Sequence, residues 1–192
     1  MGNLTDHFAG GGGGSNILEE LIGPCDGNSM TVSSGTYTFP NVTSITALTT
    51  SNNTIPGSEI SYTAPAGATK LLYSFEFKIE QVSYSGISHY KLLVDNTEVT
   101  AAYRDFAFAY NSSEHSSDVF IMHYVFDLTA ASDDVANGKF NGWSSSKTIK
   151  VTGREYSSTY QVNVNANHYR DGGGASGIYE VAKPILTIKA YK

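Results

Sequence analysis

The chain has 192 residues, of which 16% are charged, and its formal net charge is −6 at pH 7. This length allows one well-buried core without disulfides or metal. The acidic balance, with no basic run, argues against nucleic acid as a partner, since that affinity comes largely from Lys and Arg. No apolar run approaches the roughly 18 residues of a membrane span, so we expect no membrane insertion.

The first segment is a short peptide, residues 1–9, followed by the tract GGGGGS at 10–15. Glycine loses more backbone entropy on ordering than any other residue, so this tract resists a fixed local structure. The apolar side chains of Leu4 and Phe8 suggest a tethered peptide that docks onto another surface. A frayed terminus is the alternative interpretation.

No basic segment followed by an apolar stretch marks a secretory signal in this N-terminal region, so we expect none. Cys25 has no second cysteine with which to form a disulfide. The sequence therefore indicates folding in a reducing cytoplasm, or a fold that needs no bridges.

Residues 16–22 predict a short α-helix. Asn16 is a suitable N-cap, Glu19 stands three residues later as its capping-box partner, and Gly23-Pro24 would end the helix. One apolar stripe of this helix consists of Ile17, Leu18, Leu21 and Ile22. Two turns are marginal alone, so the stripe must pack on the parent domain, on another copy, or on the structure that anchors the protein. We assign residues 1–27 to an anchoring arm.

From residue 29 onward the hydrophobic period is two, which is typical of β-strands. Candidate strands are 29–33, 35–39, 44–49, 58–63, 71–80, 87–94, 97–102, 118–128, 147–155, 159–168 and 184–191. The sequence thus predicts an all-β protein: an antiparallel β-sandwich (jelly roll) preceded by an extended arm with one short α-helix. Residues 28–57 would form a strand-containing connector, and 58–192 the jelly-roll domain.

The strand expected at 118–128 is apolar on both faces, which indicates that both faces are covered. A sandwich covers only one of them, so we expect a neighbouring subunit over the other. A helix or loop of the same chain, such as the helix at 16–22, is the alternative cover. The expected oligomer interface consists of Phe120, Met122, Tyr124 and Phe126.

No catalytic motif is present: the sequence lacks a nucleophile elbow, a P-loop and a dinucleotide-binding glycine fingerprint. Cys25 has no basic activator near it in sequence, and the five histidines lack metal-ligand spacing. A carboxylate pair for glycoside hydrolysis needs only closeness in space, and no acidic residue is singled out by its context. We expect no enzymatic activity, no cofactor and no metal.

One aromatic-rich stretch, 101–111, combines aromatic side chains with Arg and Asn, as glycan-binding and protein-binding surfaces do. The candidate glycan contacts are Tyr103, Phe106, Phe108, Tyr110 and Trp143. An ordinary strand with period-two alternation explains the same stretch, and the sequence favours that explanation.

Several strings resemble small virion proteins of marine bacteriophages. They are 62–70 (YTAPAGATK), 87–95 (ISHYKLLVD), 143–150 (WSSSKTIK), 154–156 (REY), 167–174 (NHYRDGGG) and 183–188 (KPILTI). The resemblance covers residues 58–192 and carries no catalytic residues. It implies a compact trimeric jelly roll of the tumour-necrosis-factor and C1q shape, attached to the particle through an N-terminal peptide.

The expected function is therefore that of a bacteriophage structural protein: a fibre-like, decoration or tail-accessory component. It would be assembled into the virion in the host cytoplasm. Its partners would be capsid, portal, neck or tail proteins, further copies in a homotrimer, and a host-surface glycan. A soluble carbohydrate-binding module or lectin is the alternative.

Overall fold

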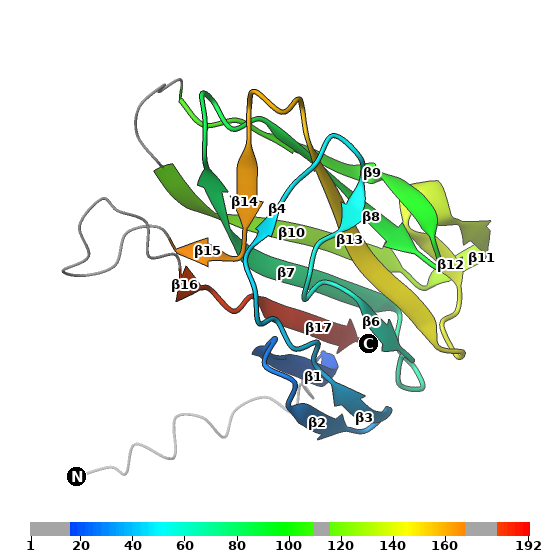
Figure 1. Cartoon of the computed structure of the whole chain (residues 1–192). Helices are drawn as coiled ribbons and strands as arrows, with labels where there is room; N and C mark the ends of the chain where they lie inside the picture. Colours follow the sequence, from blue (N-terminus) through cyan, green and yellow to red (C-terminus); the bar gives the residue numbers. More distant parts are fainter. Residues whose placement is uncertain (1–15, 110–115, 168–179) are drawn as a thin grey trace, which may run out of the picture.

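Two packed β-sheets form the body of the molecule in the computed structural model (Figure 1), which describes residues 16–109, 116–167 and 180–192. The larger sheet has the strand order β1-β17-β7-β10-β12-β11, and β14 joins it by pairing with both β7 and β4. The smaller sheet has the order β5-β13-β8-β9, with β6 also paired to β13. The all-β sandwich expected from the sequence is thus present.

The strands of the larger sheet are β1 (Ile17–Pro24), β4 (Thr46–Ala47), β7 (Lys70–Gln81), β10 (Ser116–Asp127), β11 (Thr129–Asp134), β12 (Lys139–Asn141), β14 (Val162–Val164) and β17 (Ile185–Tyr191). Those of the smaller sheet are β5 (Asn53–Thr54), β6 (Ile60–Tyr62), β8 (Ser88–Val94), β9 (Thr97–Phe106) and β13 (Lys147–Glu155). The described elements are completed by two two-stranded sheets, β2 (Ser29–Val32) with β3 (Gly35–Thr38) and β15 (Ala166–Asn167) with β16 (Glu180–Val181), and by the 3-10 turn η2 (Val135–Asn137).

Strand β7 is the centre of the larger sheet, and its sequence explains why. Its odd-numbered apolar residues are all buried: Leu71, Tyr73, Phe75, Phe77 and Ile79. It pairs with β10 over twelve residues in antiparallel register, from Gln81 opposite Ser116 to Lys70 opposite Asp127. On its other edge it pairs with β17. Strict alternation fixes this register, because a slip of one residue would turn the buried set to the outside.

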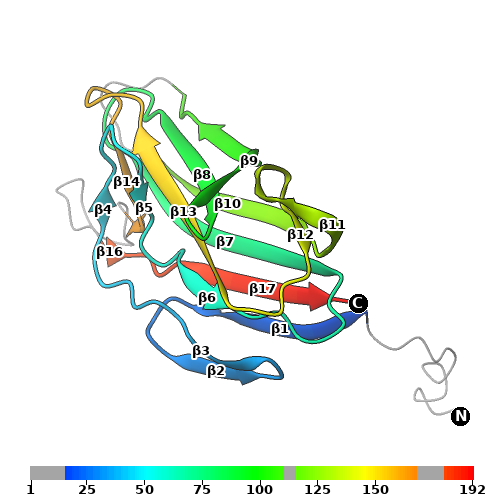
Figure 2. The same ribbon diagram turned by 90° about the vertical axis from the view of Figure 1, so that its right-hand side faces the viewer.

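The core lies between the two sheets, which face each other in Figure 2. Aromatic rings from opposite sheets meet there: the ring of Tyr90 on β8 lies 5.4 Å from that of Phe77 and 4.4 Å from that of Phe120, between centroids. Gly153 on β13 allows a close approach, since a Cβ atom there would lie 2.8 Å from both the Tyr90 ring and Ile55. The expected connector, residues 28–57, adds Phe39, Val42, Leu48 and Ile55 to the same core.

The helix predicted at 16–22 is wrong, because residues 17–24 form the edge strand β1. It pairs with β17 from Ile17 opposite Tyr191 to Pro24 opposite Ile185. This pairing satisfies the backbone in a way that an isolated two-turn helix could not match. The residues before Asn16, and with them the peptide and the glycine tract, lie outside the described residues.

Two side chains explain the extended conformation of β1. Glu19, expected to cap a helix, points inward, where its carboxylate accepts hydrogen bonds from the hydroxyls of Ser33 and Ser34, each at 2.5 Å, and from that of Tyr62. Gly23, expected to stop a helix, leaves room for the Phe39 ring, which would lie 2.7 Å from a Cβ atom at this position. Neither contact is visible in the local sequence.

Strand β10 is apolar on both faces, as expected, but the structure assigns the faces in the opposite way. Phe120, Met122 and Phe126 are buried in the chain's own core, at 8%, 0% and 0% exposed. Tyr124 is half-buried and donates its hydroxyl proton to the Asn137 carbonyl at 2.9 Å. The expected interface is therefore corrected: Phe120, Met122 and Phe126 belong to the chain's own core, and the exposed apolar side chains of β10 are Val119, Ile121 and Val125.

Candidate functional site

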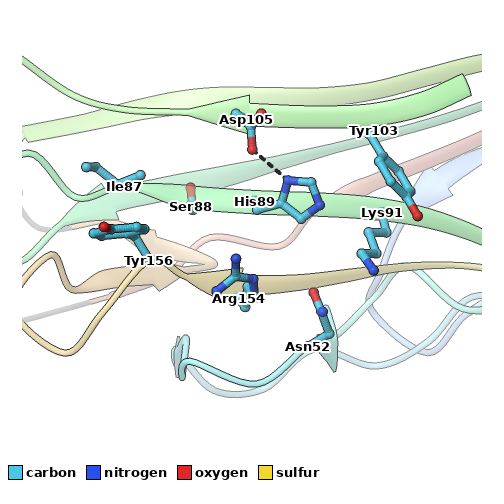
Figure 3. A pocket seen from close by; sticks show the side chains of 9 residues that line it. All are labelled: Asn52, Ile87, Ser88, His89, Lys91, Tyr103, Asp105, Arg154 and Tyr156. Atoms are coloured by element: carbon cyan, nitrogen blue, oxygen red, sulfur yellow. Dashed lines mark hydrogen bonds and ion pairs between the residues drawn. The ribbon is translucent and has the colours of Figure 1, made fainter. Parts of the chain in front are cut away.

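A groove of about 340 Å³ lies on the outer surface of the smaller sheet. Its walls come from strands β8, β9 and β13 and from the segments next to β5 and β13 (Figure 3). The lining residues are Asn52, Ile87, Ser88, His89, Lys91, Tyr103, Asp105, Arg154 and Tyr156. We call this site the groove.

Strand register aligns the charged side chains of the groove in one row. His89 on β8 stands directly opposite Arg154 on β13 and, on its other side, opposite Asp105 on β9. Residues paired in this way have Cβ atoms about 5 Å apart and point to the same face. Three residues from separate parts of the sequence are thus brought to one line across the sheet.

His89 is held in a fixed orientation at the centre of that row. Its Nδ1 atom lies 2.6 Å from Oδ1 of Asp105, and its ring meets the Tyr103 ring edge-on at 5.4 Å between centroids. The carboxylate accepts from Nδ1–H, which leaves Nε2 free to contact a ligand. The His89 side chain is 22% exposed, so it remains accessible from solvent.

Lys91 and Tyr103 form one end of the groove, and both are tied to Glu98. The Lys91 ammonium lies 2.7 Å from Oε1 of Glu98, and the Tyr103 hydroxyl donates to Oε2. The hydrogen bond to Glu98 raises the pKa of Lys91, and the bonds from Lys91 and Tyr103 lower the pKa of Glu98. Lys91 therefore keeps its charge, but that charge is already compensated.

Tyr156 and Ile87 form the other end. Tyr156 is 61% exposed, the highest value among the exposed large hydrophobic side chains of the described residues. Its backbone N–H donates to the Ile87 carbonyl at 2.9 Å, which fixes it beside the end of β13. The tyrosine ring is thus presented on a rigid backbone, as aromatic platforms for flat ligands are.

The groove offers no nucleophile to the His89–Asp105 pair. Of its described lining residues only Ser88 carries a serine or cysteine nucleophile, and Ser88 is 1% exposed and neighbours His89 on the strand, where successive side chains point to opposite faces. Cys25 is fully buried elsewhere, and burial raises the pKa of its thiol to about 12.

Metal binding and membrane crossing find no support in the described ranges. No three His, Cys, Asp or Glu side chains among the described residues gather closely enough to hold a metal ion. Over the same part of the chain, no helix has the length and hydrophobicity that a membrane span requires.

The glycan contacts expected from the sequence are only partly brought together. Tyr103 lines the groove. Phe106 and Phe108 are half-buried and meet each other edge-on at 4.9 Å, and Tyr110 lies outside the described residues. Trp143 is corrected: it is 3% exposed, its Nε1–H donates to the Tyr62 carbonyl at 3.0 Å, and its ring packs on Phe140 in the core.

A second surface, on the outer side of the larger sheet, is rich in exposed hydrophobic side chains. Six of the eight exposed large hydrophobic side chains in the described residues lie on it: Ile17, Ile22, Val119, Ile121, Val125 and Ile185. We call this surface the apolar face. The cross-strand register groups its members: Ile121 stands opposite Glu76, which stands opposite Ile185, and Val125 stands opposite Leu72.

The expected anchoring residues divide between this face and the core. Ile17 and Ile22 are 38% and 47% exposed on the apolar face. Leu21 is fully buried and Leu18 is partly buried against the core. Leu4 and Phe8 lie outside the described residues. Among the described members of the set, Ile17 and Ile22 are therefore the exposed ones.

The groove residues that sequence reasoning missed are Asn52, His89, Lys91, Asp105, Arg154 and Tyr156. Period-two alternation places Arg154 and Tyr156 on one face of a correctly expected strand. The row also depends on the register of β13 against β8 and of β8 against β9, and no single segment determines these registers.

No protein-family model and no curated protein matches this sequence. Among solved structures, the CBM36-1 domain of a multidomain xylanase from the hindgut metagenome of Trinervitermes trinervoides aligns over 88% of this chain and 96% of its own, at 11% identity and a TM-score of 0.32. The sugar-binding C-terminal domain of EclA covers 64% of this chain and 74% of its own, at 11% identity and a TM-score of 0.32.

A structure of infectious bursal disease virus, strain Gt, aligns over 86% of this chain and 47% of its own, at 9% identity and a TM-score of 0.24. At such scores these likenesses identify no relative. No functional residue is transferred from any of the three structures.

Proposed function

We propose that this protein is a non-enzymatic β-sandwich that binds a glycan in the groove and is held in a larger assembly by its apolar face and N-terminal end. The observation that carries the binding part is the groove itself: a fixed histidine, an arginine, an amide and two tyrosines converge there from separate strands. Sugar-binding sites need this combination of flat apolar surface and hydrogen-bonding groups.

The dimensions of the groove support a saccharide of more than one ring. Thr152, Arg154 and Tyr156 follow one another at two-residue steps along β13 and just past its end. Lys91 of β8 stands opposite Thr152. Each step is about 7 Å, so the groove extends over about 13 Å. A sugar ring stacked on Tyr156 would leave its neighbour beside Arg154 and His89.

A glycan array probed with the full chain tests the binding part. Tyr156→Ala is expected to weaken binding roughly fivefold or more, because stacking on an exposed ring contributes about 1 kcal/mol. Tyr191→Ala, which removes a half-buried tyrosine beside Val125 of the apolar face, is the matched control and should bind as the wild type does. Sugar binding that Tyr156→Ala leaves intact would overturn the groove as the site.

The assembly part of the proposal rests on the apolar face. Between Val119 and Asp127 of β10 it is about 26 Å long, and its four strands make it about 19 Å wide. That is roughly 500 Å² per copy, so contact with a second copy removes about 1,000 Å² from water, the lower range for a specific interface. The face carries both charge signs, including the Lys189–Glu20 ion pair at 2.7 Å, so two copies need not repel each other.

We further propose that the assembly is a bacteriophage virion, in which the chain is a fibre-like, decoration or tail-accessory component, arranged as a homotrimer and projecting the groove toward host-surface glycan. The support is the sequence resemblance of residues 58–192 together with the exposed Ile17 and Ile22 at the N-terminal end. Deletion of residues 1–15 should abolish incorporation into particles and leave the β-sandwich folded. Normal incorporation of that truncated chain would overturn the anchoring role.

A soluble carbohydrate-binding module is the second candidate, and the groove favours it equally. It differs in what the apolar face does. A module needs no self-association, so a chain that binds glycan as a stable monomer at high concentration would favour this candidate over a virion component.

A further inference from the structure

The groove contains one cation, Arg154, that forms no ion pair with another described residue. Arg154 is half-buried at the centre of the groove wall, and no hydrogen bond or ion pair to another described residue engages its guanidinium. Lys91, in contrast, is paired with Glu98, and His89 with Asp105. Arginine presents five N–H donors in a planar fork, which matches the geometry of an oxyanion.

Two further groups next to Arg154 can complete such a site. Asn52 lines the same groove, and its side-chain amide is likewise free of hydrogen bonds to other described residues. The Nε2 atom of His89 is directed away from Asp105, into the groove (Figure 3). Side chains from β13, β8 and the segment before β5 thus offer three unused polar groups around one hollow.

We propose that the groove binds a saccharide carrying an oxyanion substituent, either a carboxylate or a sulfate ester, with Arg154 as its direct partner. This inference rests on the proposed glycan-binding function and names the class of sugar. The oxyanion accepts from the guanidinium of Arg154, Asn52 bonds an adjacent hydroxyl, and the neighbouring ring stacks on Tyr156. The charge-assisted bonds to Arg154 are roughly twice as strong as neutral ones, so they decide between acidic and neutral sugars.

Because the chain carries a net negative charge, a preference for acidic over neutral sugars has to come from the groove itself. At −6 overall, the protein as a whole repels an acidic polymer, so non-specific attraction does not bring one to the surface. Binding of such a polymer therefore requires a local partner. The single uncompensated cation of the groove is in the position to be that partner.

Four soluble probes test the inference by calorimetry with the full chain: oligogalacturonate and its carboxyl-reduced form, and a sulfated galactan oligosaccharide and its desulfated form. In at least one pair, the anionic member should bind tenfold or more tightly than its neutral counterpart. The pair that shows the difference identifies carboxylate or sulfate as the substituent. Arg154→Met should abolish the difference in that pair.

Arg104→Met is the matched control, because it removes the same charge from the exposed surface of β9 without touching the groove. Arg104 does not line the groove, and its Nη1 donates to the Tyr103 carbonyl at 2.8 Å. The control should keep the preference for the anionic sugar. An equal loss in both variants would mean a general charge effect and would overturn the inference.

Two outcomes separate this inference from the function on which it rests. Equal binding of anionic and neutral sugars that is lost in Tyr156→Ala but kept in Arg154→Met overturns the oxyanion partner and leaves glycan binding standing. Binding of none of the four probes, together with a glycan array without a positive result, overturns both.

Discussion

The two outer surfaces of the sandwich are built on the same alternation and have opposite character. On the larger sheet, three outward positions of β10 carry Val119, Ile121 and Val125, at 41%, 41% and 54% exposed, and exposed His123 stands between the last two. On the smaller sheet, the outward positions of β8, β9 and β13 carry His89, Asp105 and Arg154. Burial fixes the inner half of each strand, so the outer half is free to differ, and we propose that one surface serves assembly and the other binds a ligand.

Three buried aromatic residues belong to neither surface. Trp143, Phe140 and Phe126 lie between the sheets. The centroid of the Trp143 ring lies 4.7 Å from that of Phe140 and 5.5 Å from that of Phe126. They resemble a ligand-binding aromatic cluster in composition only. Their separation from both surfaces is the first point that can be tested.

The largest expected effect is loss of stability in Trp143→Ala. Removal of a buried tryptophan costs about 3–5 kcal/mol of unfolding free energy. Chemical denaturation measures this, and Trp143→Phe should recover much of the loss. Sugar affinity of the folded fraction should not change. A variant that lost sugar binding at unaltered stability would place Trp143 at the ligand instead.

A smaller effect is expected for Glu19→Gln, which weakens the attachment of β1 and so of one edge of the apolar face. Burial raises the pKa of the Glu19 carboxyl, but the hydrogen bonds from Ser33, Ser34 and Tyr62 outweigh it, so this pKa lies below its ordinary value of 4.5. The carboxylate therefore stabilises the fold fully above about pH 4.5, and this contribution is lost as the pH falls through the lowered pKa.

Urea unfolding at several pH values measures that contribution. Glu19→Gln should lower the unfolding free energy by about 1–3 kcal/mol at pH 7, the cost of disturbing hydrogen bonds to a buried charged group. The difference from the wild type should shrink toward pH 3. Glu20→Gln, on the solvent side of the same strand, should have a much smaller effect, and equal losses in the two variants would contradict the role of Glu19.

The smallest effect is expected at the edge of the groove, in Glu98→Gln. The partly exposed Lys91–Glu98 pair should contribute less than about 1 kcal/mol to folding. Its removal releases the Lys91 charge into the groove, so affinity for an anionic sugar should rise two- to threefold by calorimetry. A fall in affinity would indicate that Glu98 positions Tyr103 rather than compensating Lys91.

Much of the sandwich could be predicted from the sequence, because a strand with one buried face has apolar residues at every second position. The strand expected at 147–155 coincides with β13, and those at 71–80 and 118–128 nearly coincide with β7 and β10. Asp95 and Asn96, which lie between the strands expected at 87–94 and 97–102, have positive φ, at 48° and 65°, as a two-residue hairpin turn requires.

The failures share one cause, which is contact between segments distant in sequence. Glu19 suits a helix cap locally, but its partner Tyr62 is 43 residues away. The two apolar faces of β10 cannot be told apart until β8 covers one of them. The groove is likewise a product of register, since Asp105, His89 and Arg154 belong to three strands.

Sedimentation velocity of the full chain tests most directly whether the two surfaces have separate roles. The wild type should sediment as a species larger than the 20.6 kDa chain, Val125→Asp on the apolar face should sediment as the monomer, and Tyr156→Ala in the groove should keep the wild-type size. A wild type that stays monomeric at high concentration, or dissociation caused equally by Tyr156→Ala, would contradict the division between an assembly face and a binding groove.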